Sequence, residues 1–135
     1  MSETEKILET ARTMMDRAYA PYSHFPVGAV IITDTGRVYA GCNVENASYP
    51  VGSCAEQSAI AAMIAGGDKK IAGIYIMGNG KNPVSPCGAC RQRIREFSMP
   101  ETKVFICDRK GVRETWTLAD LLPCSFGPEN LSEQE

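Results

Sequence analysis

The stretch Ile71-Ala72-Gly73-Ile74-Tyr75-Ile76-Met77 decides how this chain folds. It is apolar almost throughout and lacks the polar alternation of a strand that has one face in water. A continuous apolar run of this length indicates a central strand whose two faces are both covered. We therefore expect an α/β fold, in which helices pack against a sheet that contains this segment.

Periodicity and turn residues predict the remaining elements on either side of this strand. Before it we expect a helix, a hairpin and a second helix, and after it a helix, two strands, a short helix and a polar tail. The expected ranges are 2–20, 27–33, 37–42 and 54–65 before the strand, then 87–97, 103–107, 112–116, 117–122 and the tail at about 127–135. This order predicts a single domain over residues 1–135, with a mixed five-stranded sheet flanked by helices.

Composition and charge exclude several classes of protein. With 44% hydrophobic and 22% charged residues, the 135-residue chain has the composition of a globular domain. Its formal net charge of −2 and the lack of basic runs argue against a nucleic-acid partner. No apolar run approaches the roughly 18 residues that cross a bilayer, and the N-terminus lacks a secretory pattern. We therefore expect a cytoplasmic location and no membrane partner.

Three of the six cysteines have the spacing of a zinc site. In a reducing compartment, cysteines are more often metal ligands or core thiols than disulfides. Cys87 and Cys90 lie three residues apart at an expected helix start, so they share one face, and Cys54 lies at the start of the preceding helix. Backbone N–H groups at a helix start stabilise thiolates. Three protein ligands and one open position are typical of catalytic zinc, which lowers the pKa of a bound water.

Glu56 lies two residues after Cys54. In the middle of a helix these side chains would point about 200° apart, but in the first turn Glu56 can point over Cys54. Glu56 can then reach the water without binding the metal. Zinc deaminases combine these features in the signature H-x-E…P-C-x-x-C or its three-cysteine variant, in which a glutamate that is not a ligand moves protons. The pattern therefore predicts a zinc-dependent deaminase in which Glu56 is catalytic.

With these residues, the chain resembles the small, homotetrameric cytidine deaminases over nearly its whole length. Further segments carry the resemblance: Ala20-Pro21-Tyr22-Ser23 with Phe25, Asn43-Val44-Glu45-Asn46, and Arg91-Gln92. The resemblance implies the three-layer fold of that family and Zn²⁺ as its cofactor. It implies hydrolytic deamination of cytidine and deoxycytidine to uridine and deoxyuridine, with release of ammonia, in pyrimidine salvage. It also implies a homotetramer whose sites are shared between subunits.

The resemblance assigns substrate contacts to particular residues. Phe25 would pack on the pyrimidine face, and Asn43 and Glu45 would hydrogen-bond the ribose, with Glu45 at the 3′-hydroxyl. A carboxylate accepts hydrogen bonds from sugar hydroxyls but repels a phosphate, so we expect nucleotides to be rejected. The backbone amide of Ala55 would bind the ring carbonyl. Tyr49 and Phe126 would reach the site of a neighbouring subunit.

One position departs from the family pattern. Many relatives with three cysteine ligands have an arginine directly after the catalytic glutamate, which offsets the negative charge of the thiolates. Here that position is Gln57. Its side-chain N–H, or Arg91 beside Cys90, could take this role.

Two other functions compete with this interpretation. In a non-catalytic zinc-binding module, a fourth thiolate such as Cys107 or Cys124 would close the site, and Glu56 would have no role. A deaminase of a nucleoside-like antibiotic or a free base could share the zinc motif, but Asn43 and Glu45 argue against it. The remaining cysteines, Cys42, Cys107 and Cys124, are expected to be buried thiols.

Overall fold

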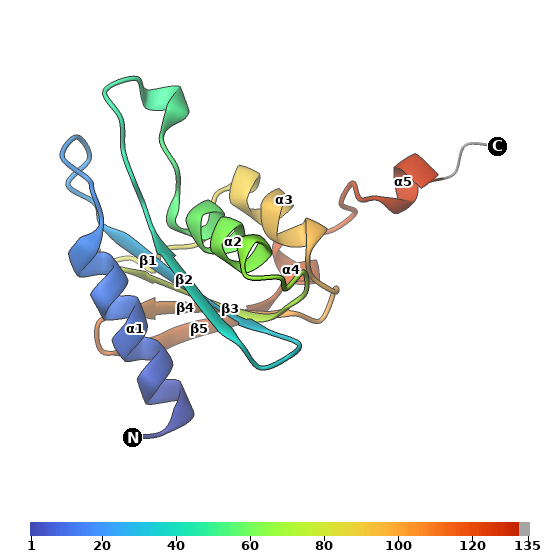
Figure 1. Cartoon of the computed structure of the whole chain (residues 1–135), viewed down its shortest axis with the longest axis horizontal. Helices are drawn as coiled ribbons and strands as arrows, with labels where there is room; N and C mark the ends of the chain where they lie inside the picture. The colour runs from blue at the N-terminus through green and yellow to red at the C-terminus, as the bar shows by residue number, and fades with distance from the viewer. Residues whose placement is uncertain (133–135) are drawn as a thin grey trace.

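The computed structural model describes residues 1–132 and contains one mixed five-stranded sheet (Figure 1). The strands lie in the order β2 (Val38–Cys42), β1 (Val27–Thr33), β3 (Ile71–Gly78), β4 (Lys103–Asp108) and β5 (Gly111–Thr117). Only β3 and β4 pair in parallel; the other neighbours are antiparallel. The apolar run at 71–77 therefore forms the central strand, as predicted. No helix in the described part of the chain is long and apolar enough to cross a membrane.

Helices cover both faces of the sheet and make a three-layer domain. Helix α1 (Glu3–Arg17) packs on one face, where it meets Tyr75 and Met77 of β3. Helices α2 (Ala55–Ala65) and α3 (Gly88–Glu96) pack on the other face, where Ile74 and Ile76 point. Because neighbouring residues of a strand point to opposite faces, the consecutive apolar side chains of residues 74–77 fill both cores.

Both helices that carry the candidate ligands begin one residue later than expected. Cys54 and Cys87 are the N-cap residues of α2 and α3, with extended backbone angles. An N-cap residue lies outside the helical conformation, so its side chain projects from the end of the helix. The two helices start at the same end of the molecule (Figure 1).

Close packing fixes the position of α2 on the sheet. A Cβ atom on Gly41 of β2 would lie 2.4 Å from the backbone nitrogen of Ala59. Any larger residue at this position would therefore push α2 outward and move its first turn. The absence of a side chain at Gly41 of β2 thus helps to set where α2, and with it Cys54 and Glu56, lies.

The C-terminal segment differs most from the sequence prediction. After α4 (Leu118–Leu121), the tail that was expected to be only polar chain forms a short helix, α5 (Glu129–Ser132). The backbone N–H of Gly127 donates to the Asn130 side chain, and Arg95 pairs with Glu129. This segment extends away from the sheet (Figure 1). The end of the expected tail, residues 133–135, lies outside the described residues.

Candidate active site

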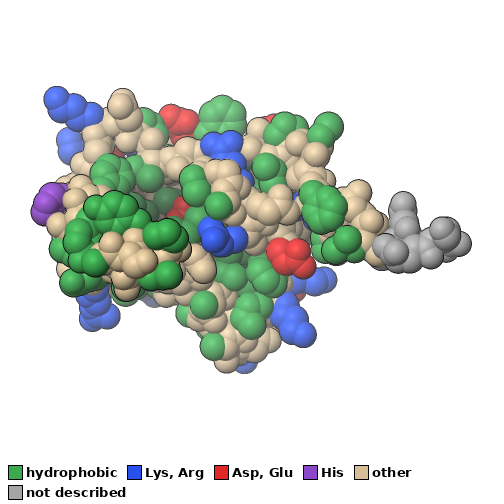
Figure 2. All heavy atoms as spheres, turned by 90° about the horizontal axis from the view of Figure 1, so that it is seen from above, with side chains coloured by type: hydrophobic (Ala, Val, Ile, Leu, Met, Phe, Trp, Pro, Cys, Tyr) green, Lys and Arg blue, Asp and Glu red, His purple; other side chains and the backbone are tan. Residues whose placement is uncertain are grey.

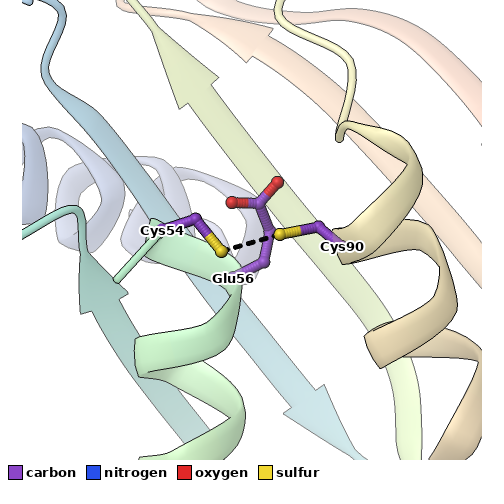
Figure 3. Close-up of side chains that lie close together, drawn as sticks. All are labelled: Cys54, Glu56 and Cys90. Atoms are coloured by element: carbon purple, nitrogen blue, oxygen red, sulfur yellow. Dashed lines mark hydrogen bonds between the residues drawn. The ribbon is translucent and has the colours of Figure 1, made fainter. Parts of the chain in front are cut away.

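Cys54, Glu56 and Cys90 form a compact cluster between the first turns of α2 and α3 (Figure 3). The Sγ atoms of Cys54 and Cys90 are 2.7 Å apart, and one ligand atom from each residue lies within 4.8 Å of the others. Among residues 1–132, this is the one group of cysteine, histidine or acidic side chains that could hold a metal ion. We call these three residues the helix-start cluster.

The two thiols of the helix-start cluster have opposite pKa shifts. The hydrogen bond with Cys90 lowers the pKa of Cys54 to about 6, and the backbone N–H of Gln57 and the charge of Arg93 act in the same direction. The same hydrogen bond and then burial raise the pKa of Cys90. The lowered pKa favours the thiolate form of Cys54, the form in which cysteine binds metals.

Glu56 is a buried carboxyl group, with only 5% of its surface exposed. Burial raises its pKa to about 7, and the nearby Cys54 contributes in the same direction. A carboxyl group with a pKa near the ambient pH can both accept and donate a proton, which general acid–base catalysis requires.

Cys87 lies at the same end of α3 but is exposed and outside the helix-start cluster. It is near enough for its charge to raise the pKa of Cys90, after the hydrogen bond to Cys54, burial and the charges of Glu56 and Cys54. Two thiols and a carboxylate within 4.8 Å, with a third thiol nearby, are the donor types that zinc prefers. The residues present therefore fit a zinc ion.

A cavity of about 620 Å³ adjoins the helix-start cluster. Cys54 and Glu56 line it together with Ala55, and its other walls include the predicted substrate residues Phe25, Asn43, Glu45 and Tyr49. Its volume is typical of sites for small molecules, about 300–1,000 Å³. Hydrophobic side chains gather at the end of the molecule that carries the single histidine, His24 (Figure 2).

Asn43 and Glu45 brace residues 22–27 of the cavity wall through hydrogen bonds, a role that the sequence did not indicate. Asn43 Oδ1 accepts a hydrogen bond from the backbone N–H of Val27 (2.9 Å), and its Nδ2 donates to the carbonyl of Phe25 (2.9 Å). Glu45 accepts hydrogen bonds from the backbone N–H groups of Tyr22 and Ser23, and from the Ser23 hydroxyl. The Ser23 hydroxyl is the main cause of the lowered pKa of Glu45, so this group is a carboxylate.

The two aromatic residues assigned to subunit contacts lie differently. Tyr49, in the short 3-10 helix η1 (Tyr49–Val51), is 74% exposed at the cavity wall, and its ring centroid is 5.9 Å from that of Tyr22. Phe126 does not line the cavity and is 58% exposed. Its carbonyl accepts a hydrogen bond from Gln92 Nε2 (2.9 Å), which attaches the segment to α3. The structure therefore brings together every predicted substrate residue except Phe126.

The other cysteines do not close the helix-start cluster. Cys107 is buried beneath α1, on the opposite face of the sheet. Cys124 is exposed and has a left-handed backbone conformation after α4, so the prediction of a buried thiol was wrong for this residue. It follows α4 at the end of the sheet domain and belongs to neither core of buried residues. Neither thiol belongs to the cluster, which argues against a closed zinc-binding module.

The basic residue that contacts the helix-start cluster is Arg93, which sequence reasoning missed. Its Nη1 lies 3.7 Å from Cys90 Sγ. Arg91, which was considered for this role, donates instead to the carbonyls of Pro86 and Leu121. The three-residue spacing between Cys90 and Arg93 on α3 could have indicated the contact, since such residues share a helix face.

Comparisons with known proteins agree with this geometry. The sequence profile described as "Cytidine and deoxycytidylate deaminase zinc-binding region" matches residues 1–106. The cytidine deaminase of Sporosarcina psychrophila is 39% identical over 130 residues, 96% of each chain. That of Mycoplasma genitalium is 40% identical over 123 residues, 90% of this chain and 94% of the other.

Solved structures are similar over the same length. The cytidine deaminase from Burkholderia pseudomallei has a TM-score of 0.84 and 40% identity, covering 93% of this chain and all of the other (100%). The cytidine deaminase from Mycobacterium tuberculosis has a TM-score of 0.78 and 34% identity, covering 94% and 99%. The chain belongs to the cytidine and deoxycytidylate deaminase zinc-binding family.

Proposed function

We propose that this chain is a zinc-dependent enzyme that deaminates cytidine and deoxycytidine to uridine and deoxyuridine, with release of ammonia. The observation that carries the proposal is the buried Glu56 beside two thiols on the wall of a cavity that Asn43 and Glu45 also line. Relatives at 39% and 40% identity that carry the name cytidine deaminase support the same reaction.

Cys54, Cys87 and Cys90 would hold the zinc, leaving Glu56 free. Zinc, when bound, supplies a water of lowered pKa as the nucleophile. Thiolates formed at two helix starts suit such an ion, and both helices are anchored in the core, so the sulfur atoms are held in place.

Glu56 would carry the protons of the reaction. The carbon that bears the amino group gains oxygen from water and loses ammonia, so protons must pass from the water to the ring nitrogen and to the leaving amine. The carboxyl group of Glu56 can accept a proton from the water and deliver it to the ring nitrogen, and can then do the same for the leaving amine. Burial raises the pKa of Glu56 to about 7, which suits this exchange at neutral pH.

Asn43 and Glu45 would select a nucleoside. The family name includes deaminases of both nucleosides and nucleotides, so membership in the family does not decide between these substrate classes. A carboxylate at the cavity wall accepts hydrogen bonds from ribose hydroxyls and repels a phosphate. Asn43 uses one Oδ1 lone pair and one Nδ2 N–H in its hydrogen bonds to Val27 and Phe25. Its second lone pair and its second N–H remain for the sugar. Phe25 would pack on the pyrimidine, and the N–H of Ala55 would bind its carbonyl.

The active assembly would be a homotetramer with shared sites. Phe126 is a large apolar side chain exposed on a segment that extends from the domain, and Tyr49 is exposed at the cavity entrance. Contact with a neighbouring subunit would cover both. A cytoplasmic location and a role in pyrimidine salvage complete the proposal.

A direct assay tests the substrate assignment. Absorbance changes with cytidine, deoxycytidine and CMP would be followed side by side, with ammonia release as a check. We expect turnover of both nucleosides and poor turnover of CMP. Equal efficiency with CMP would contradict the ribose assignment, and no ammonia from either nucleoside would contradict the proposed reaction.

A further inference from the structure

The proposed zinc site has an excess of negative charge. Three thiolates around a divalent ion leave a net negative charge, and the buried carboxyl of Glu56 lies within 4.8 Å of the thiols of Cys54 and Cys90. Negative charge that is withdrawn from water is costly unless a cation or hydrogen-bond donors compensate it. Excess charge also weakens a metal ion's ability to polarise what it binds.

Three arginines on α3 could supply the compensating cation, and two of them are engaged elsewhere. Arg91 donates to Pro86 and Leu121 carbonyls at 2.8 and 2.7 Å and to the Ser85 hydroxyl at 2.7 Å. Arg95 donates to the Ser125 hydroxyl at 2.9 Å and pairs with Glu129. Both arginines therefore hold neighbouring segments against α3.

Arg93 alone among the three faces the thiols. Its Nη1 is 3.7 Å from Cys90 Sγ, within the range of a hydrogen bond to sulfur. Its charge also acts on the other two members of the helix-start cluster, lowering the pKa of Cys54 and opposing the rise at Glu56. One guanidinium thus interacts with two candidate ligands and with the proton carrier.

Gln57 does not provide this compensation through its side chain. The residue is exposed, and its contribution to the helix-start cluster is its backbone N–H, which donates to Cys54. The cation near the thiolates, Arg93, is thus carried by α3 in this chain. Gln57, which follows Glu56 on α2, lies near the Cys54 thiolate but has no charge.

We propose that Arg93 is the positioning residue that balances the thiolate charge of the zinc site. It takes this role from α3 because Gln57, the neighbouring position on α2, is neutral. The inference rests on the proposed function, since it needs zinc at these cysteines. Arg93 acts through the ligand sulfur and does not touch the substrate.

Metal affinity tests this role independently of turnover. Zinc dissociation constants would be measured at pH 7 by competition with a chromogenic chelator. Arg93→Gln should weaken zinc binding and lower kcat by about 10- to 100-fold, the typical effect of losing an outer-sphere partner. Arg93→Lys should keep part of the affinity because the charge remains. Arg113→Gln, the same change on β5 at the edge of the sheet, should leave both values unchanged.

A second cation on α2 separates charge from packing. In the double variant Arg93→Gln, Gln57→Arg, the new guanidinium adjoins Cys54, and we expect most of the lost zinc affinity to return. Wild-type zinc affinity in Arg93→Gln would overturn the proposal. So would equal losses in Arg93→Gln, Arg93→Lys and the double variant, because position 93 would then act through packing. Failure of the unmodified chain to bind zinc would instead contradict the proposed function.

Discussion

The two sides of the cavity are built in different ways. Glu56 and Cys90 are 5% and 1% exposed and are carried by helices that pack in the core. Asn43, Glu45 and Tyr49 lie on a loop that is held by side-chain hydrogen bonds and by an isolated bridge between Val44 and Ser53. The proposed function thus places the chemistry, which needs fixed geometry, on rigid elements and the substrate selection on a loop.

We call the side with the helix-start cluster and Cys87, at the starts of α2 and α3, the core side, and the cavity wall that carries Asn43, Glu45 and Tyr49 the loop side. Substitutions on the core side should abolish the reaction, whereas substitutions on the loop side should alter which substrate is bound and how tightly. The helix-start cluster is complete within one chain, whereas Tyr49 and Phe126, the residues of the proposed subunit contacts, are exposed in the single chain.

The largest effect is expected at Cys87, on the core side. Cys87→Ala should remove most of the zinc and reduce turnover to the limit of detection, because an open three-thiolate site would lose one ligand. Zinc content by atomic absorption and turnover of cytidine would be measured on the same sample. Cys124→Ser is the matched control, since this exposed thiol is outside the cluster. Full zinc content in Cys87→Ala would mean that Glu56 is a ligand instead.

On the loop side, Glu45→Gln should raise KM for cytidine more than it lowers kcat. The loss of charge-assisted hydrogen bonds predicts a fall in kcat/KM of about 10- to 100-fold. The ratio of kcat/KM for cytidine to that for CMP should also fall, because the carboxylate charge that repels the phosphate is gone. Steady-state kinetics with both substrates check this.

Because Glu45 also holds the turn at Tyr22 and Ser23, its bracing must be separated from its binding. Ser23→Ala removes the hydroxyl hydrogen bond and keeps the carboxylate. We expect it to retain the discrimination against CMP. Equal narrowing in Ser23→Ala and Glu45→Gln would assign the effect to loop geometry.

A smaller effect is expected at Phe126. Phe126→Ala should raise KM about tenfold with unchanged zinc content, since it removes apolar packing on the substrate and leaves the thiols alone. Mixing Phe126→Ala subunits with inactive Glu56→Gln subunits should restore some sites of normal KM. In such sites, an intact Glu56 and a neighbour's Phe126 combine. No restoration, in preparations shown to exchange subunits, would mean that the site is built within one chain.

The parts of this molecule that the sequence predicts well are those set by local pattern. The apolar run at 71–77 predicts the central strand and both covered faces. The spacing of the predicted ligands Cys54, Cys87 and Cys90 places them at two helix starts, where Cys54 and Cys90 meet Glu56 while Cys87 stays outside the helix-start cluster. These features depend on periodicity and on helix starts, which a sequence displays directly.

Contacts between distant segments were harder to predict. The bracing by Asn43 and Glu45 joins residues 16 to 23 positions apart, and the effect of Arg93 on Cys54 depends on how α3 faces α2. The short helix α5 depends on Asn130 accepting from Gly127, in a segment whose composition suggests only a polar tail. Each of these contacts requires side chains that are brought together only in the folded structure.

Glu56 is proposed to move protons without holding the metal, and Glu56→Gln tests this role most directly. Zinc content and turnover of cytidine would be measured on one preparation, with Glu101→Gln, an exposed glutamate, as the control. We predict full zinc content, an unchanged fold, and a fall in kcat of at least the roughly 10²- to 10⁴-fold expected from loss of a general acid–base group. Near-normal turnover, or loss of the zinc together with the activity, would contradict this account.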